Sequence, residues 1–239
     1  MKQSAKKKPN RTASVKASAQ PKRRRLVLLD DHPIMRHGAA QLLSMESALE
    51  VCAQVGTAAE AMKAIAELKP DLLVLDLSLP DKHGLELIKD LQTMHPEVLL
   101  LVLSMHDESL YAERVLRAGA RGYLMKKSAS DYLVKAVHRV LDGGIYLSEE
   151  MAGAMLELLG GKRKTPSGGT GLEKLTDREI EVFQLIGSGK SSRQIAEQLH
   201  VSMRTVDAHR AHIKDKLGLP DGVALVRHAV RWAESQADG

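Results

Sequence analysis

Two acidic positions in the chain directly follow apolar runs that have the length of a β-strand. Asp76 comes after residues 72–75, and the pair Asp30 and Asp31 comes after residues 26–29. Unbroken apolar runs of this kind fit parallel strands that are covered on both faces. Taken alone, Asp76 reads as a solvated residue at a strand end. The second acidic position changes this interpretation, because the carboxyl ends of parallel strands share one edge, where ligands bind.

Two further polar residues occupy equivalent places, since Ser104 follows the apolar run 98–103 and Lys126 follows residues 122–125. Clustered carboxylates repel each other, and a bound divalent cation commonly offsets this repulsion. Oxygen ligands and a coordination shell that is partly open to water and phosphate favour Mg²⁺. An Asp in such a site can attack a phosphoryl group and become an aspartyl phosphate. Mg²⁺ and a Lys ammonium then offset the charge of the transferring group, and a Ser hydroxyl donates to a phosphoryl oxygen. The pattern predicts a phosphoacceptor site centred on Asp76.

The elements that position these residues alternate along the chain. Five strands alternating with five helices call for a parallel sheet with helices on both faces, which is an α/β domain. We place this domain at residues 26–145. The expected strands are 26–29, 49–55, 72–75, 98–103 and 122–125, and the expected helices are 34–45, 58–68, 85–94, 108–118 and 131–141.

The remaining chain has no strand pattern. Residues 146–171 contain a short helical stretch at 149–159 and then a segment rich in Gly and Lys, which we expect to be a flexible linker. Residues 172–239 predict a separate all-helical domain. Thr176 and Glu179 have the spacing of a capping box, which opens the first helix. Two short helices, a tight turn and a longer helix that ends at Leu217 indicate a helix-turn-helix.

The longer helix has two distinct faces. Val206, His209, Ile213 and Leu217 form its expected core stripe, where His209 is read as a packed, hydrogen-bonded His and not as a metal ligand. Residues on the exposed face of a recognition helix read base edges, and basic and hydroxyl side chains beside them take phosphates. The candidates for base contacts are Arg204, Asp207, Ala208 and Ala211. The candidates for phosphate contacts are Ser191, Ser192, Arg193, Thr205, Arg210, His212, Lys214 and Lys216.

The formal charge of +5 is distributed unevenly along the 239 residues. Residues 1–25 hold ten Lys or Arg and no acid, whereas residues 26–150 hold 12 basic and 19 acidic side chains. The basic segment is too poor in apolar residues to fold, so we expect a disordered tail that is either a solubilising leader or an arm contacting DNA phosphates. Cys52 is the only cysteine, which excludes an intramolecular disulfide. Without a membrane-spanning apolar run, we expect a cytoplasmic protein.

Residues 26–142 resemble the receiver domain of a two-component response regulator. The resemblance rests on the acidic pair, on Asp76 between two leucines, on Pro80-Asp81 with Gly84, on Ser104 and on Lys126. It implies a flavodoxin-like fold with strand order 2-1-3-4-5. It also implies Mg²⁺ held by Asp31, Asp76 and the backbone carbonyl of Ser78, with Asp30 assisting.

Two assignments stay open within this resemblance. Lys126 and its neighbour Lys127 can each be the lysine of the site, and the register of the apolar run favours Lys126. Tyr123 lies where receivers carry an aromatic residue whose rotamer couples to Ser104. Its alternative role is packing in the core.

Residues 175–219 resemble a LuxR-type helix-turn-helix, through Leu175-Thr176-x-Arg178-Glu179 and through the spacing of Thr205, Val206, His209 and Ile213. Together with the receiver, this gives the NarL/FixJ class of response regulators. The class implies a sensor histidine kinase as phosphodonor, double-stranded DNA as ligand, a homodimer when active, and a receiver that masks the recognition helix before phosphorylation. This chain departs from many relatives by placing Asp207, Ala208 and Ala211 on the recognition face.

Two other functions remain open at this point. An aspartate-nucleophile phosphatase shares the Mg²⁺ and the acyl phosphate, but such enzymes usually carry a second Asp two residues after the nucleophile, where this chain has Ser78. A DNA-binding regulator can also use a receiver only for oligomerisation, independently of phosphorylation. The complete set of acidic residues favours a transcription regulator controlled by phosphorylation of Asp76, which is not an enzyme.

Overall fold

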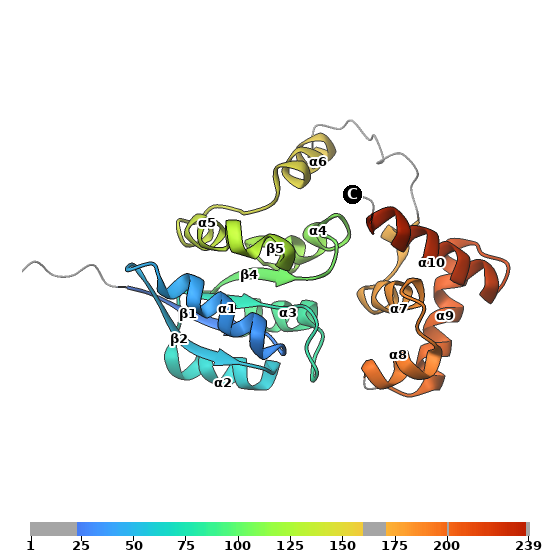
Figure 1. Ribbon diagram of the computed structural model, residues 1–239, viewed down its shortest axis with the longest axis horizontal. Helices are drawn as coiled ribbons and strands as arrows, with labels where there is room; N and C mark the ends of the chain where they lie inside the picture. The colour runs from blue at the N-terminus through green and yellow to red at the C-terminus, as the bar shows by residue number, and fades with distance from the viewer. Residues whose placement is uncertain (1–22, 160–170, 200, 238–239) are drawn as a thin grey trace, which may run out of the picture.

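The computed structural model describes residues 23–159, 171–199 and 201–237 (Figure 1). Its N-terminal half is built on one sheet of five parallel strands in the order β2-β1-β3-β4-β5. The predicted α/β fold and strand order are therefore confirmed. The strands are β1 (Arg24–Leu29), β2 (Leu49–Val55), β3 (Leu72–Leu75), β4 (Leu99–Ser104) and β5 (Gly122–Met125).

Five helices cover the two faces of this sheet. Alternate side chains of a strand point to opposite faces, so β1 divides its residues between two apolar clusters. Leu26 and Leu28 pack with α1 and α5, whereas Val27 and Leu29 pack with α2, α3 and α4. The helices are α1 (Pro33–Ser44), α2 (Ala58–Leu68), α3 (Gly84–Met94), α4 (Glu108–Ala118) and α5 (Ala129–Leu141).

The loop between β3 and α3 is held tightly against the start of α3. The N–H of Gly84 donates to the carbonyl of Leu77 over 2.9 Å. A side-chain carbon added at Gly84 would lie 2.5 Å from the Cα of Leu77, so only glycine permits this close approach. The contact fixes the backbone that immediately follows Asp76.

The C-terminal helices are joined to this α/β part through residues 160–170, which lie outside the described segments together with most of the predicted linker. The helix α6 (Glu149–Leu159) precedes them and packs against α4. The helices α7, α8, α9 and α10 surround Phe183, Ile195, Val206 and Ile213, which are all fully buried. Their bounds are α7 (Asp177–Gly187), α8 (Ser192–Gln198), α9 (Met203–Leu217) and α10 (Gly222–Ala237).

Several boundaries differ from those expected. β1 begins at Arg24 and not at residue 26, because Asp71 accepts hydrogen bonds from the backbone of Arg25 and the side chain of Arg24. Arg24 and Arg25, which were assigned to the predicted basic tail, therefore belong to β1, and the prediction for residues 1–22 lies outside the described part of the chain. The last helix, α10, extends from Gly222 to Ala237. No helix of the described segments has the length and apolar character needed to cross a membrane.

The predicted capping box at the start of α7 is present. The side chain of Thr176 accepts from the N–H of Glu179, and the Glu179 carboxylate accepts from the N–H of Thr176 over 2.8 Å. Burial raises the pKa of Glu179, but hydrogen bonds from Lys216 and Thr176 outweigh burial and hold the pKa below its ordinary value of 4.5. The stabilisation from this carboxylate is thus complete above pH 4.5 and is lost as the pH falls through the lower, folded value.

We expect Thr176→Ala to lower the free energy of unfolding of the helix-turn-helix by about 1 kcal/mol, because the N–H of Glu179 loses its acceptor. Trp232, the only tryptophan, lies in α10 and reports this transition by fluorescence during urea unfolding. Thr176→Ser keeps the hydroxyl and serves as the control. Equal stability of the Ala and Ser variants would show that the cap is unimportant.

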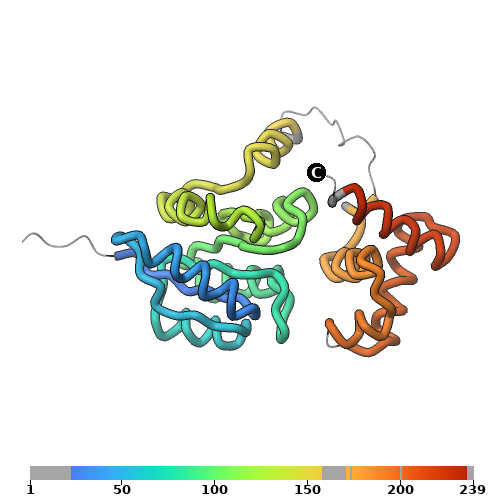
Figure 2. Tube along the Cα trace, viewed as in Figure 1, coloured from blue at the N-terminus to red at the C-terminus, as the bar shows by residue number. Residues whose placement is uncertain are grey.

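The helix-turn-helix part lies beside the carboxyl edge of the sheet, with α7 and α8 facing the ends of the strands (Figures 1 and 2). Hydrogen bonds connect the two parts: Arg114 of α4 donates to Asp177, the first residue of α7, and to the carbonyl of Leu175. This arrangement places a second domain next to the residues that the sequence singled out for chemistry.

Candidate phosphoacceptor site and DNA-binding surface

Asp76 lies at the carboxyl end of β3 with only 3% of its surface exposed. Its Oδ1 accepts hydrogen bonds from the N–H of Leu77 at 2.7 Å and from the hydroxyl of Ser104 at 2.8 Å. Its Oδ2 lies 2.7 Å from the Nζ of Lys126. Three predicted site residues on three different strand ends therefore meet in direct contact, as expected from a parallel sheet.

Lys126 is the buried cation of the site. Its Nζ also lies 2.7 Å from Oδ2 of Asp30, so one ammonium joins two carboxylates. Burial alone lowers the pKa of Lys126, but attraction to Asp76 and the hydrogen bonds that Lys126 donates to both carboxylates raise it above its ordinary value of 10.5. Lys127 is exposed. Of the two adjacent lysines, Lys126 is the one at the site, because the short 3-10 helix Lys126–Ser128 begins directly at the strand end.

The acidic residues form a cluster that can hold a cation. Ligand atoms of Asp30, Asp31, His32 and Asp76 all lie within 4.8 Å of one another. Asp30 is buried, whereas Asp31 is about one-third exposed, so the cluster opens to solvent on one side. Carboxylate oxygens with an open side suit Mg²⁺, which keeps several waters and binds substrate phosphate. The donor set fits the ion that the sequence predicted.

His32 also belongs to this cluster, although no predicted site included it. Its Nδ1 lies 2.6 Å from Oδ1 of Asp31. Ser78, whose carbonyl was predicted to bind Mg²⁺, places its hydroxyl 2.9 Å from Nε2 of His106. No sequence motif marks His32 or His106 as a site residue, because the role of each depends on residues that only the fold brings next to it.

A chain of contacts leads from Asp76 into the loop before α4. The hydroxyl of Ser104 accepts from the N–H of His106 at 3.5 Å, and the phenol of Tyr123 donates to the carbonyl of His106 at 2.7 Å. The Tyr123 side chain is fully buried, and its burial raises the pKa of the phenol. Tyr123 thus both packs in the core and contacts the loop that Ser104 contacts.

The predicted recognition face of α9 is open. All four candidates for base contacts are exposed, whereas Val206 and Ile213 on the opposite face are fully buried. The hydroxyl of Ser192 donates to Oδ1 of Asp207 over 3.1 Å. Ser192 therefore orients the one acidic side chain of the recognition face. The four exposed residues are Arg204, Asp207, Ala208 and Ala211.

The receiver does not cover this face, in contrast to the expected mask. The hydrogen bonds between the two parts run through α7 and the residues just before it, and the outer side of α9 is exposed. His209 also differs from expectation. It is partly buried as predicted, but its Nδ1 has no hydrogen-bond partner among the described residues. Burial lowers the pKa of His209, which favours a neutral, packed imidazole.

The predicted phosphate-binding residues differ in how far they are already engaged. Lys216 is paired with the buried Glu179 at 2.6 Å, and Arg193 is paired with Glu197 at 3.0 Å. Ser191 caps α8 by accepting from the N–H of Gln194. Apart from Ser192, whose hydroxyl donates to Asp207, the others lie along or beside the recognition face, and no carboxylate of the described residues pairs with them at hydrogen-bond distance. These are Thr205, Arg210, His212 and Lys214.

Comparisons with known proteins agree with this geometry. Residues 26–138 match the model of the response regulator receiver domain, and residues 173–229 match that of the bacterial regulatory proteins of the luxR family. The oxygen regulatory protein NreC of Staphylococcus aureus strain JH9 is 34% identical over 210 residues, which cover 87% of this chain and 97% of NreC. The chain belongs to the response regulator family, in the class with a LuxR-type helix-turn-helix.

Solved structures of other response regulators share this architecture. RcsB of Salmonella enterica serovar Typhimurium, bound to promoter rprA with the phosphomimetic BeF₃⁻, has a TM-score of 0.61 and 25% identity, covering 87% of this chain and 98% of RcsB. A structure of two RcsB dimers on two parallel DNAs has a TM-score of 0.54 and 25% identity, covering 86% and 97%. This response regulator therefore shares both of its folded parts with proteins solved on DNA.

Proposed function

We propose that this response regulator is a transcription factor switched by phosphorylation of Asp76. The supporting observation is the set of contacts at Asp76, where an amide, a hydroxyl and an ammonium converge on one buried carboxylate. A sensor histidine kinase is the proposed phosphodonor, and double-stranded DNA is the proposed ligand of α9. One chain carries both the receiver, which would be phosphorylated, and the helix-turn-helix, which would bind DNA.

The proposed transfer uses an oxygen of the Asp76 carboxylate as nucleophile. This oxygen forms a bond to phosphorus while the bond from phosphorus to the donor's imidazole nitrogen breaks, and the imidazole leaves with the electron pair. Lys126 is positioned to pair with a phosphoryl oxygen, and Ser104 to donate to another. Asp30, Asp31 and Asp76, with the carbonyl of Ser78, would hold Mg²⁺, which supplies further neutralisation of the phosphoryl charge.

The proposed switch passes through the loop that precedes α4. The acyl phosphate carries roughly 1.5 to 2 negative charges at neutral pH, in place of the single charge of the Asp76 carboxylate. Ser104 contacts Asp76 on one side and the N–H of His106 on the other, and Tyr123 holds the carbonyl of the same residue. A change in the position of the Ser104 hydroxyl therefore acts on His106, two residues before α4, and Tyr123 contacts the same residue through its carbonyl.

The full chain tests this proposal directly. With acetyl phosphate as donor, it is expected to incorporate phosphate in the presence of Mg²⁺, and excess EDTA is expected to reduce incorporation to background. Steady release of inorganic phosphate from small phosphomonoesters would instead support the phosphatase alternative. Phosphorylation without any change in DNA binding would support the alternative in which the receiver serves only oligomerisation.

We propose that α9 reads bases with Arg204 and Asp207 and contacts phosphates beside them, in a homodimer on two half-sites. Asp207 can accept from cytosine N4, and alanine can contact a thymine methyl. Arg204→Ala is expected to weaken binding to a selected operator by about 1–3 kcal/mol and to relax its sequence preference at one position.

Lys214→Ala is the matched comparison for this variant. It is expected to weaken binding to all DNA sequences to a similar degree and to reduce the dependence of log affinity on log salt by about one. Fluorescence anisotropy with specific and scrambled duplexes over a range of salt separates the two effects. If both variants shift only the salt dependence, Arg204 does not contact bases.

A further inference from the structure

A cavity of about 650 Å³ lies between the phosphoacceptor edge of the receiver and the helix-turn-helix. On the receiver side it is lined by the loops after β1, β3 and β4, which include Asp31, Ser78 and His106. On the opposite side it is lined by α7, α8 and α10, which include Glu181, Leu199 and Trp232. We call this space the rim cavity. The DNA-binding part therefore stands across the side on which the acidic cluster opens.

Arg114 of α4 joins the two parts through contacts that lie outside the lining of the rim cavity. Its guanidinium donates to Oδ1 of Asp177 and to the carbonyl of Leu175, each over 2.9 Å, and to the carbonyl of Leu172 over 3.4 Å. The Arg114 side chain is largely buried between the two parts. Hydrogen bonds from a charged donor are stronger than neutral ones. We call these contacts the Arg114 clamp.

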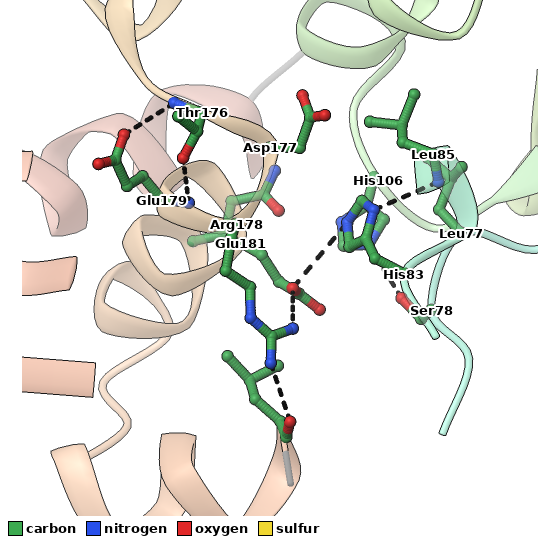
Figure 3. A network of polar contacts seen from close by, with 12 residues as sticks. Leu77, Ser78, His83, Leu85, His106, Thr176, Asp177, Arg178, Glu179 and Glu181 are labelled. Carbon is green, nitrogen blue, oxygen red and sulfur yellow. Dashed lines mark hydrogen bonds and ion pairs between the residues drawn. The ribbon is translucent and has the colours of Figure 1, made fainter. Parts of the chain in front are cut away.

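Two further contacts lie between the clamp and the phosphoacceptor. The phenol of Tyr111 donates to Gln184 over 3.4 Å, and Nε2 of His83 lies 3.9 Å from Glu181 (Figure 3). Nδ1 of His83 accepts from the N–H of Leu85, so Nε2 carries the proton that faces Glu181. Arg178 lies beside Glu181 on the same wall. On this wall, Arg178 and Glu181 of α7 form an ion pair, and Glu181 and Gln184 contact residues of the receiver.

The size of the rim cavity separates two kinds of phosphodonor. A volume of this order is typical of a pocket for a small molecule. An α-helix with its side chains is 10–12 Å wide, so a single turn occupies roughly 400–600 Å³. A kinase presents its phosphohistidine on a folded domain and needs room for several helices at the rim. Because α7, α8 and α10 line one side of this cavity, a folded donor domain approaching the rim would meet these helices, whereas a small acyl phosphate can enter between the two parts.

We propose that the Arg114 clamp makes the closed form of this response regulator selective for small acyl phosphates, and that a protein phosphodonor gains access to Asp76 only when the clamp opens. The inference rests on the proposed phosphorylation of Asp76. In the closed form, an oxygen of Asp76 attacks the phosphorus of acetyl phosphate, the bond from phosphorus to the acetyl oxygen breaks, and acetate leaves with the electron pair. The clamp acts on access, because it touches neither Asp76 nor the acidic cluster.

Cysteine labelling in the full chain measures this access without a kinase. Cys52→Ser removes the only native thiol, and Ser78→Cys places one in the wall of the rim cavity. The small probe is iodoacetamide, and the large probe is a maleimide joined by a short linker to a small globular protein. Each is applied with Arg114 intact, with Arg114→Ala, and with Arg117→Ala, a control on the same helix whose side chain is exposed and pairs with Glu113.

Iodoacetamide is expected to react at similar rates in all three chains. The large probe is expected to react about tenfold faster with Arg114→Ala than with the other two, which corresponds to about 1.4 kcal/mol of interdomain contact. Equal rates of the large probe in all three chains would overturn the proposal, because either the rim is already open or the clamp does not close it. Failure of iodoacetamide to react would overturn it too, because small donors could not enter.

Phosphorylation with acetyl phosphate, measured separately with Ser78 in place, distinguishes this inference from the proposed function. The intact chain and Arg114→Ala are both expected to be phosphorylated, at similar initial rates. If neither chain takes up phosphate, the proposed function fails while the labelling result still decides whether the rim is closed. If only Arg114→Ala is phosphorylated, the closed form excludes small donors as well and the proposed selectivity is wrong.

Discussion

Replacing Asp76 by Asn is expected to abolish incorporation of phosphate from acetyl phosphate and, with it, every phosphorylation-dependent change in DNA binding. The amide keeps the size of the side chain and can still accept from Leu77 and Ser104, so the fold should persist. It is a much weaker nucleophile, because the carboxylate charge is lost. Gel separation of the phosphorylated and unphosphorylated chain measures incorporation, and circular dichroism confirms folding.

Asp81→Asn is the matched control. Asp81 lies in the same loop but accepts from the backbone N–H groups of Ala58 and Ala59, at 2.9 and 3.0 Å, and so caps the start of α2. It is expected to retain incorporation of phosphate. If Asp76→Asn were phosphorylated as well as Asp81→Asn, the acceptor would have to be another residue.

Replacing Lys126 by Ala is expected to lower the free energy of unfolding of the receiver by about 3 kcal/mol in Mg²⁺-free buffer. The substitution removes the one cation that lies between two buried carboxylates, and removal of one partner of a buried ion pair typically has an effect of this size. Because the pKa of Lys126 is raised, its contribution is complete below 10.5 and is lost only as the pH rises through the higher folded value. The difference in free energy of unfolding between wild type and Lys126→Ala is therefore expected to be constant at neutral pH.

Urea unfolding followed by circular dichroism measures this difference, while Trp232 fluorescence follows the helix-turn-helix separately. Added Mg²⁺ is expected to restore part of the stability, because a divalent cation compensates the same carboxylates. Lys127→Ala removes an exposed ammonium from the next residue and is expected to change stability by less than about 0.5 kcal/mol. Equal losses for the two variants would contradict the assignment of Lys126 to the site.

The sequence was sufficient to predict the candidate phosphoacceptor site, because a parallel sheet converts order along the chain into position in space. Asp30, Asp76 and Lys126 each follow a strand and Ser104 is the last residue of one, and strand ends of a parallel sheet meet at one edge. The same logic favoured Lys126 over Lys127, since one residue of register separates a buried side chain from an exposed one. For the recognition helix, a period of 3.6 residues separated Val206 and Ile213 from the exposed face.

Other features have no local signature in the sequence. Arg114 acquires its role from partners 58 to 63 residues away, and His106 from Ser78, 28 residues away. Periodicity marks Arg114 only as a polar residue on an amphipathic helix. The expected mask over α9 was based on resemblance to a class, whereas the contact through α7 depends on the particular pairing of Arg114 with Asp177. Relative placement of two domains is set by such side chains and not by the pattern that folds each domain.

Genome-wide footprinting of DNA with the purified full chain tests the central claim most directly. Wild type and Asp76→Asn are each compared with and without acetyl phosphate and Mg²⁺. The proposed switch predicts that phosphorylation of the wild type creates or strengthens a set of protected sites, and that the variant shows the unphosphorylated pattern under both conditions. Identical footprints in all four samples would contradict control of DNA binding by Asp76.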